Sequence, residues 1–452
     1  MSALRTDVRL AWELVRGTDR REWWRIGLTA AGAALATGFA LAAVLLASLR
    51  GTYSVPHFHG LLDQPGTRAG IVVGLLLSLV PVLGFLGQCA RVGAVDRDRR
   101  LAGLRLTGAS PGQVRRIAAL ETGPACLLGS VTATVCAVVA VPQVWNSPPV
   151  AAWSGLALVA VTVPAAGAAV SALALRRVVA HPLGRVRRVT PRSGRGPGLV
   201  FLGALLLVAV TAAAAVAATG GGTDGRVRWQ ASATVCALAV ATGAGAVWLS
   251  GAVSRLTGRL LAARARTAAT LIAAERLRAD PWAAARTHAA VLLVTVTGTA
   301  FLCVRHALLA TLAAAEHPAT DPAYYSTGLD LTGAALLVAL VVALSGLAVG
   351  SAESLATRRR TLAAQVAAGV PRAVLNRALL LETALPLAPA LLAAGAAGLA
   401  IGIWYSALTG VGSLPWTAPL AAPAVYASCL LASATALPLL GRTVRPGELR
   451  YA

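Results

Sequence analysis

The chain of 452 residues repeats itself, without a gap, at a constant offset of 261 residues. Apolar and polar stretches both match. Polar matches are Asp19 with Asp280, Arg25 with Arg286, Arg97 with Arg358, Gly108 with Gly369 and Glu121 with Glu382. Matches between leucines arise easily by chance in so apolar a chain, whereas charges and glycines matched at one offset do not. The repetition predicts that a unit of about four hydrophobic segments was duplicated.

Long hydrophobic runs indicate the fold class. Hydrophobic residues make up 57% of the chain and charged residues 13%, which excludes a disordered or ordinary soluble protein. Runs of about 20 apolar residues, enough to cross the hydrocarbon core as a helix, predict ten spans: 26–48, 70–90, 122–141, 150–175, 199–218, 231–250, 289–308, 329–350, 384–405 and 416–440. We expect an all-α integral membrane protein with about ten transmembrane helices.

The repeat and the spans together predict the domain organisation. Residues 1–25 would form a cytoplasmic interfacial helix and residues 26–176 a first four-span module. Residues 177–265 would form a basic linker with connector spans 5 and 6, residues 266–440 a second four-span module, and residues 441–452 a cytoplasmic tail. Because the connector has an even number of spans, the two four-helix repeats would be parallel, entering the membrane in the same direction.

The charge distribution predicts the topology. The chain has no lysine, so all 40 of its basic residues are arginines, and 35 of them fall in cytoplasmic segments if the N-terminus is inside. This positive-inside pattern predicts cytoplasmic N- and C-termini. We therefore attribute the net charge of +23 to topology and to contact with anionic membrane lipid, not to nucleic acid. The alanine- and arginine-rich, lysine-free composition suggests a high-GC bacterial genome, so we expect the chain to lie in a bacterial plasma membrane.

A polar loop between spans 2 and 3 recurs between spans 8 and 9. In the first copy a helix-compatible stretch stops at Gly108, since glycine often ends a helix in the left-handed conformation. Ser110 and Pro111 suit the N-cap and first position of the next helix. In the second copy Gly369 is the stop and Pro371 restarts the helix. Each copy thus predicts a cytoplasmic helix–turn–helix; a capped turn with no role beyond structure is the alternative.

These loops carry a resemblance to a known family. The segment RDRRLAGLRLTGASPGQVRRIAALE (97–121) resembles the signature between the second and third spans of FtsX-like permease domains. The segment RRRTLAAQVAAGVPRAVLNRALLLE (358–382) is a more degenerate match, with Val370 where alanine is usual. The ten-span layout is similar to that of peptide-sensing and bacitracin-resistance permeases. Their large external domain between spans 7 and 8 shrinks here to about 20 residues.

The resemblance implies two docking surfaces for ATP-binding-cassette (ABC) subunits, because in this family the turn docks on a separate ATPase. The first would comprise Arg99, Arg100, Leu104, Thr107, Gly108, Ala109, Ser110 and Arg115. The second would comprise Arg359, Arg360, Ala368, Gly369, Val370, Pro371 and Arg372. This chain is not expected to be an enzyme, since a P-loop requires a lysine. ATP and Mg²⁺ would bind the partner, and no cofactor or metal is expected here.

Three of the ionisable residues near the ends of predicted spans are candidates for a role in the membrane: Glu121, Glu382 and Arg305. Glu121 and Glu382 lie where spans 3 and 9 begin, and the dipole at a helix N-terminus favours a carboxylate. They are therefore interpreted as structural anchors, with a proton-carrying role as the alternative. Arg305, near the outer end of span 7, suits snorkelling or contact with an anionic substrate.

The resemblance implies the transmembrane permease subunit of an ABC transporter, one chain with two ATPase subunits. It would couple ATP hydrolysis to movement or extraction of a lipophilic or amphiphilic substrate. A mechanotransmission or signalling subunit that moves no solute would have the same coupling elements. An ion-coupled secondary transporter is a weaker alternative, because the spans hold almost no ionisable residues near mid-membrane.

Overall fold

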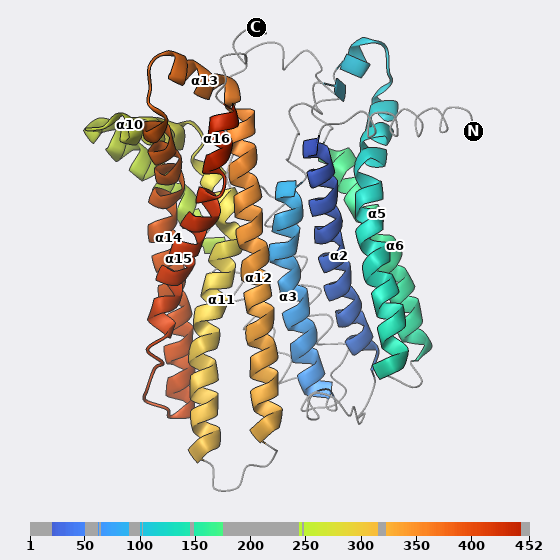
Figure 1. The fold of residues 1–452 in the computed structure, drawn as a ribbon. Coiled ribbons are helices and arrows are strands. Elements are labelled where there is room, and N and C mark those ends of the chain that lie inside the picture. The colour runs from blue at the N-terminus through green and yellow to red at the C-terminus, as the bar shows by residue number, and fades with distance from the viewer. Residues whose placement is uncertain are drawn as a thin grey trace. The chain divides into compact units, whose positions relative to one another are not determined.

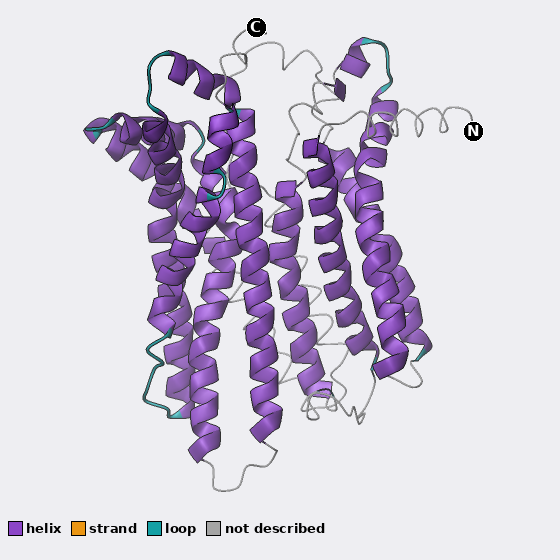
Figure 2. Cartoon of the chain, viewed as in Figure 1, coloured by secondary structure: helices purple, strands orange, loops and turns teal. Residues whose placement is uncertain are grey.

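The computed structural model describes residues 20–49, 62, 65–89, 100–101, 103–144, 149–174, 244–245, 248–314 and 322–443. Within these residues all regular secondary structure is helical and no strand occurs (Figure 2). Seven of the described helical segments are long and apolar enough to cross a membrane. The chain is therefore an all-α, multi-pass membrane protein, as its hydrophobic runs predict.

Eight of the ten predicted spans coincide with described helices. They are α2 (Arg20–Ser48), α3 (Pro65–Cys89), α5 (Pro111–Val144), α6 (Val150–Ala174), α11 (Pro281–Ala314), α12 (Pro322–Thr357), α14 (Arg372–Thr409) and the pair α15 (Ala418–Ala434) and α16 (Leu437–Thr443). Predicted spans 5 and 6 lie outside the described residues, apart from 244–245 and 248–250. Most of the predicted interfacial helix 1–25 and of the tail 441–452 also lies outside them.

The chain divides into two compact units. Unit 1 comprises residues 1–49 and 85–192, and so contains α2, the end of α3, α5 and α6. Unit 2 comprises residues 50–84 and 193–452, with the rest of α3, α11, α12, α14 to α16, and two short helices, α10 (Ala268–Ala279) and α13 (Arg359–Ala367). This division differs from the predicted modules in grouping residues 50–84 with the second half of the chain.

The same three helix pairings occur in each unit. In unit 1, α2, α5 and α6 pack against one another; in unit 2, α11, α14 and α15 do so. Helix α2 begins at Arg20 and α11 at Pro281, while α5 begins at Pro111 and α14 at Arg372. Both pairs of helices therefore start 261 residues apart, the offset found in the sequence.

Glycines allow close helix crossings in both units. Helix α5 crosses α2 at Gly129, where an added Cβ would collide with the backbone of Ala30 and Ala34. Helix α14 crosses α11 at Gly398, where a Cβ would come within 2.6 Å of the Val296 carbonyl oxygen. Hydrophobic attraction between helices is weak inside a bilayer, so close contact through small residues supplies much of their association.

The long helices are apolar on their exposed surfaces as well as where they pack against one another. On α5, Val131, Val135 and Val139 form an exposed row at intervals of four residues. On α12, Leu337 and Val341 are exposed with the same spacing. Exposed apolar rows of this kind face lipid in a membrane protein.

The tenth predicted span is two helices, α15 and α16, with a break at Thr435 and Ala436. Pro438 explains the break, because a proline has no N–H to donate and its ring clashes with the carbonyl four residues earlier, that of Ala434. Beyond the break, Leu440 is buried and α16 packs against α12 and α13. The bend thus directs the last helix toward the end of unit 2 that carries α13.

We expect Gly129→Ala to destabilise unit 1, because the new methyl group meets backbone atoms that cannot rotate away. Overpacking of this kind costs about 1–3 kcal/mol. Gly27→Ala on α2 is the matched control, since nothing lies within 4 Å of a Cβ there. Unfolding of the purified variants, followed by loss of helical circular dichroism, measures the difference. Equal unfolding midpoints would contradict the close crossing.

Candidate functional site

The turn before α5 has the hydrogen bonds of a Schellman motif. Gly108 has a φ of +100°, the left-handed conformation that glycine adopts without steric cost. Its N–H donates to the Arg105 carbonyl at 3.2 Å, and the Ala109 N–H donates to the Leu104 carbonyl at 3.0 Å. These bonds satisfy carbonyls that the end of a helix leaves without partners. The predicted glycine stop is confirmed.

The turn before α14 has the same backbone conformation. Gly369 has a φ of +88°, its N–H donates to the Val366 carbonyl at 2.9 Å, and the Val370 N–H donates to the Gln365 carbonyl at 3.0 Å. Each bond lies 261 residues after its counterpart in the first turn. The chain therefore builds one backbone turn twice, once in each unit.

The helices that follow the two turns begin differently. Ser110 is the N-cap of α5, as predicted, and its Oγ accepts a hydrogen bond from the Gln113 N–H at 3.2 Å. Helix α14 begins at Arg372, and Pro371 is its N-cap without a side-chain bond. The prediction that Pro371 restarts the helix is therefore off by one position, because Pro371 corresponds to Ser110 and not to Pro111.

The tips of both turns are exposed. In the first turn the exposed docking candidates are Thr107, Gly108 and Ser110, and Arg100 is half-buried. In the second turn the exposed candidates are Arg360, Ala368, Gly369, Pro371 and Arg372, and Arg359 is half-buried. Arg99 and the side chain of Arg115 lie outside the described part of the chain. Each tip therefore offers backbone and small side chains to a partner, with arginines beside them.

Three docking candidates lie on the inner side of the turns. Leu104 and Ala109 pack against a buried cluster under the first turn, formed by Leu101, Val114 and Ile117. Val370 packs against the corresponding cluster under the second turn, formed by Leu355, Leu362, Leu375, Ala436 and Leu440. These three side chains support the turns from within and hold each tip against the helix that follows.

Arg105 supports the first turn in a way that sequence reasoning missed. Its Nη1 donates to the Ala109 carbonyl at 2.7 Å, which ties the two sides of the turn together. Val366 occupies the corresponding position in the second turn, and its side chain has no hydrogen-bond donor. The second turn instead has a larger apolar cluster beneath it, which includes Ala436 from the break before α16 and Leu440 from α16 itself.

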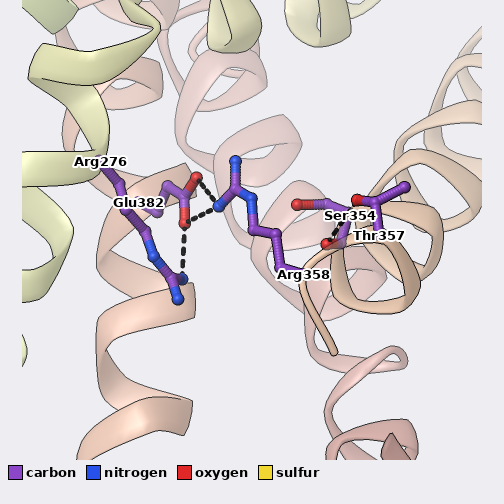
Figure 3. A network of polar contacts seen from close by, with 5 residues as sticks. All are labelled: Arg276, Ser354, Thr357, Arg358 and Glu382. Atoms are coloured by element: carbon purple, nitrogen blue, oxygen red, sulfur yellow. Dashed lines mark hydrogen bonds and ion pairs between the residues drawn. The ribbon is translucent and has the colours of Figure 1, made fainter. Parts of the chain in front are cut away.

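The carboxylate of Glu382 binds two arginines from other segments of unit 2 (Figure 3). Its Oε1 accepts a hydrogen bond from Arg358 Nη1 at 2.7 Å, and its Oε2 accepts from Arg358 Nη1 and from Arg276 Nη1, each at 3.1 Å. The Glu382 side chain is 20% exposed and that of Arg276 14%. Charges so far withdrawn from water are tolerated only when they are paired.

These ion pairs join the elements that surround the second turn. Arg276 belongs to α10, which lies across the ends of α11 and α14 (Figure 1). Arg358 is the single residue between α12 and α13. Glu382 belongs to α14, so its carboxylate ties α10 and the α12–α13 junction to the helix that follows the turn. We call Arg276, Arg358 and Glu382 the carboxylate clamp.

The clamp corrects the electrostatic explanation for the two glutamates. Helix α14 begins at Arg372 and α5 at Pro111, so Glu382 and Glu121 both lie ten residues beyond their helix starts. The effect of the helix dipole falls off within the first turn and cannot act on them. In unit 2 the two arginines supply the positive charge instead. The role of Glu382 as a structural anchor agrees with this geometry; the side chain of Glu121 lies outside the described part.

Arg305, at the other end of α11, has an acidic partner. Its Nη2 lies 2.8 Å from Oδ1 of Asp330 on α12. Both side chains are exposed, so the pair adds little stability. Nearby, His306 Nε2 lies 3.1 Å from Ser413 Oγ. Among the described residues, no group of three or more His, Cys, Asp or Glu could hold a metal ion.

Comparison with protein-family models, with curated proteins and with solved structures found no match. The resemblance to FtsX-like domains therefore rests on the segments 97–121 and 358–382.

We expect Glu382→Gln to loosen α10 and α13 from α14, because the amide leaves two partly buried arginines without a negative charge. Loss of hydrogen bonds to a charged group costs about 2 kcal/mol. Glu275→Gln is the matched control: its pair with Arg278 is about half exposed, and such pairs contribute roughly 0–1 kcal/mol. Thermal unfolding and limited proteolysis of residues 358–372 test both variants. Equal protection in the two would contradict the clamp.

Proposed function

We propose that this chain is the permease subunit of an ABC transporter, with two FtsX-like modules in one ten-span polypeptide. The observation that carries the proposal is the pair of turns at Gly108 and Gly369. Both turns have the same pattern of backbone hydrogen bonds, and both have exposed tips. Two equal turns in one chain suit a pair of identical ATPase subunits. The sequence resemblance at the same two places points to the same kind of partner.

The physical design of each turn suits the transmission of force. The tip is closed by two backbone hydrogen bonds and rests on a buried apolar cluster. A displacement at the tip would therefore move the following helix, α5 or α14, as a rigid element. In unit 2 the carboxylate clamp would carry the same displacement to α10 and α12. ATP-driven closure of the two ATPase subunits would thus switch packed helices between two arrangements.

The remaining parts of the proposal follow from the sequence. The chain would lie in a bacterial plasma membrane with both termini in the cytoplasm, as the arginine distribution favours. ATP and Mg²⁺ would be bound by the partner ATPase. Because the predicted external loops are short, the substrate would be lipophilic or amphiphilic and would be reached from the bilayer. A signalling subunit that moves no solute would use the same turns, and an ion-coupled transporter would need neither turn.

The first test is co-purification of the chain with an ABC ATPase encoded beside it. We expect a complex of one permease chain with two ATPase subunits. Replacing 107–111 and 368–372 together by Gly-Ser segments should remove the ATPase while the chain still inserts. A wild-type chain that purifies alone, without ATP-dependent activity, would contradict the proposal. ATP-dependent movement of labelled lipid in proteoliposomes distinguishes a transporter from a signalling subunit.

A second test changes only the two stop glycines. Proline cannot adopt a positive φ and has no N–H, so Gly108→Pro with Gly369→Pro removes both the left-handed conformation and one hydrogen bond from each turn. We expect ATP-dependent activity to be abolished while membrane insertion is retained. Gly112→Ala, in the first turn of α5, is the control, because its Cβ would meet only Arg116 Nη1 at 3.8 Å. Full activity in the double variant would show that the turns are not the docking sites.

A further inference from the structure

Three arginines of unit 2 converge on a cavity beside the start of α11. The cavity is open to solvent, has a volume of about 330 Å³ and is lined by Arg255, Arg259, Arg278 and Pro281. Arg255 and Arg259 lie one turn apart on the helix formed by residues 248–264, and Arg278 lies at the end of α10. We propose that this cavity binds a phosphate-bearing anion, and that an anionic phospholipid headgroup is its natural source.

The cavity is built by a close crossing of two helices. At Gly258 an added Cβ would lie 3.1 Å from the Arg278 backbone nitrogen and 3.2 Å from the Ala274 carbonyl oxygen. This close approach places Arg259, the next residue, and Arg278 at the same opening. Pro281, the first residue of α11, completes the lining. Because the N–H groups of a first helical turn have no partners within the helix, this end of α11 adds further positive potential.

The lining arginines keep most of their positive charge available to a ligand. The Arg255 guanidinium lies 5.2 Å from the ring centroid of Trp282, a contact that orients the group without neutralising it. Neither Arg255 nor Arg259 forms an ion pair with any described residue. Arg278 pairs with Glu275 at 2.7 Å, and both side chains are about half exposed.

Two carboxylates lie near the lining. Glu275 pairs with Arg278, and Asp280 is the residue before Pro281. The three guanidinium groups still exceed the two carboxylates by one positive charge, and Arg255 and Arg259 are left for a ligand. Guanidinium groups bind phosphate oxygens through pairs of parallel hydrogen bonds, so a phosphate group is the ligand that this lining fits.

The position of the cavity favours a lipid as the source of the phosphate. Pro281 precedes the apolar segment of α11, which starts at Thr287, by about 9 Å along the helix axis. This distance places Pro281 outside the hydrocarbon core, near the headgroups. Leu256 and Leu260 are exposed beside the two arginines of the same helix. Exposed leucines alternating with arginines are typical of helices that lie in the membrane interface. Anion binding at this cavity requires no ATPase and is independent of the proposed transport function.

The test compares two double variants that remove the same charge from the same segment. Arg255→Gln with Arg259→Gln removes two of the three guanidinium groups that line the cavity. Arg264→Gln with Arg266→Gln removes two exposed arginines outside it. The full-length chain is placed in nanodiscs of phosphatidylcholine, or of phosphatidylcholine with phosphatidylglycerol. Native mass spectrometry counts the phosphatidylglycerol molecules that remain bound as the chain is released. Thermal unfolding in pure phosphatidylcholine shows whether each variant is folded.

We expect wild type and the Arg264/Arg266 control to retain phosphatidylglycerol, and the Arg255/Arg259 variant to bind it about tenfold more weakly. The single variant Arg259→Gln should show the same direction if loss of the Trp282 contact unfolds the double variant. Equal weakening in both double variants would overturn the proposal, because surface charge alone would then explain binding. Inorganic phosphate that protects the wild type in pure phosphatidylcholine, with no preference for phosphatidylglycerol, would support the anion site and assign it to a soluble phosphate.

Discussion

The carboxylate of Glu382, shared by Arg276 and Arg358, is the interaction on which the end of unit 2 depends. Withdrawing a carboxylate or a guanidinium group from water costs free energy unless the charge is paired. Each charge makes the burial of the others tolerable. Because the three residues belong to α10, the α12–α13 junction and α14, satisfying the charges also fixes the relative positions of these elements. Electrostatic necessity thus sets the geometry around the second turn.

The second constraint is the hydrogen-bond requirement of a helix end near a membrane. Each helix leaves carbonyls without partners at its C-terminus, and the Schellman bonds at Gly108 and Gly369 satisfy them within the turn itself. A turn that satisfies its own backbone leaves its exposed tip available for a partner. The cost is a positive φ at one residue, which glycine alone meets without strain. This explains why both copies place glycine at that position.

Much of the fold could be predicted because local rules decide it. The apolar runs, the stop glycines and the Ser110 cap each depend on neighbouring residues, and the described structure agrees with all three. The pairing of Arg276 with Glu382 could not be predicted, since 106 residues separate them and Val15 stands at the position related to Arg276 by the repeat. The Arg358 contact did leave a signal: Arg97 and Glu121 have the same spacing as Arg358 and Glu382. Pro438 also signals the break before α16, because proline disfavours a continuous helix. The residues around it form one apolar run, however, and such a run predicts a single span.

The two turns share their backbone but not their side chains, and this difference bears on how a partner could recognise them. Ser110 corresponds to Pro371, Arg105 to Val366 and Leu106 to Ala367. A partner that recognised side chains would contact two different surfaces. A partner that recognised the backbone shape of the tip would contact the same surface twice. If the turns dock a symmetric partner, as we propose, their shared φ region and shared pattern of hydrogen bonds would matter more than any single arginine. Each set of docking candidates contains three arginines, but only Arg99 and Arg360 occupy equivalent positions. Under the proposed function these arginines would supply attraction toward acidic groups, which tolerates variation in position, while the tip must fit. Shape held by glycine and by a buried apolar cluster is thus the property that the two turns have in common.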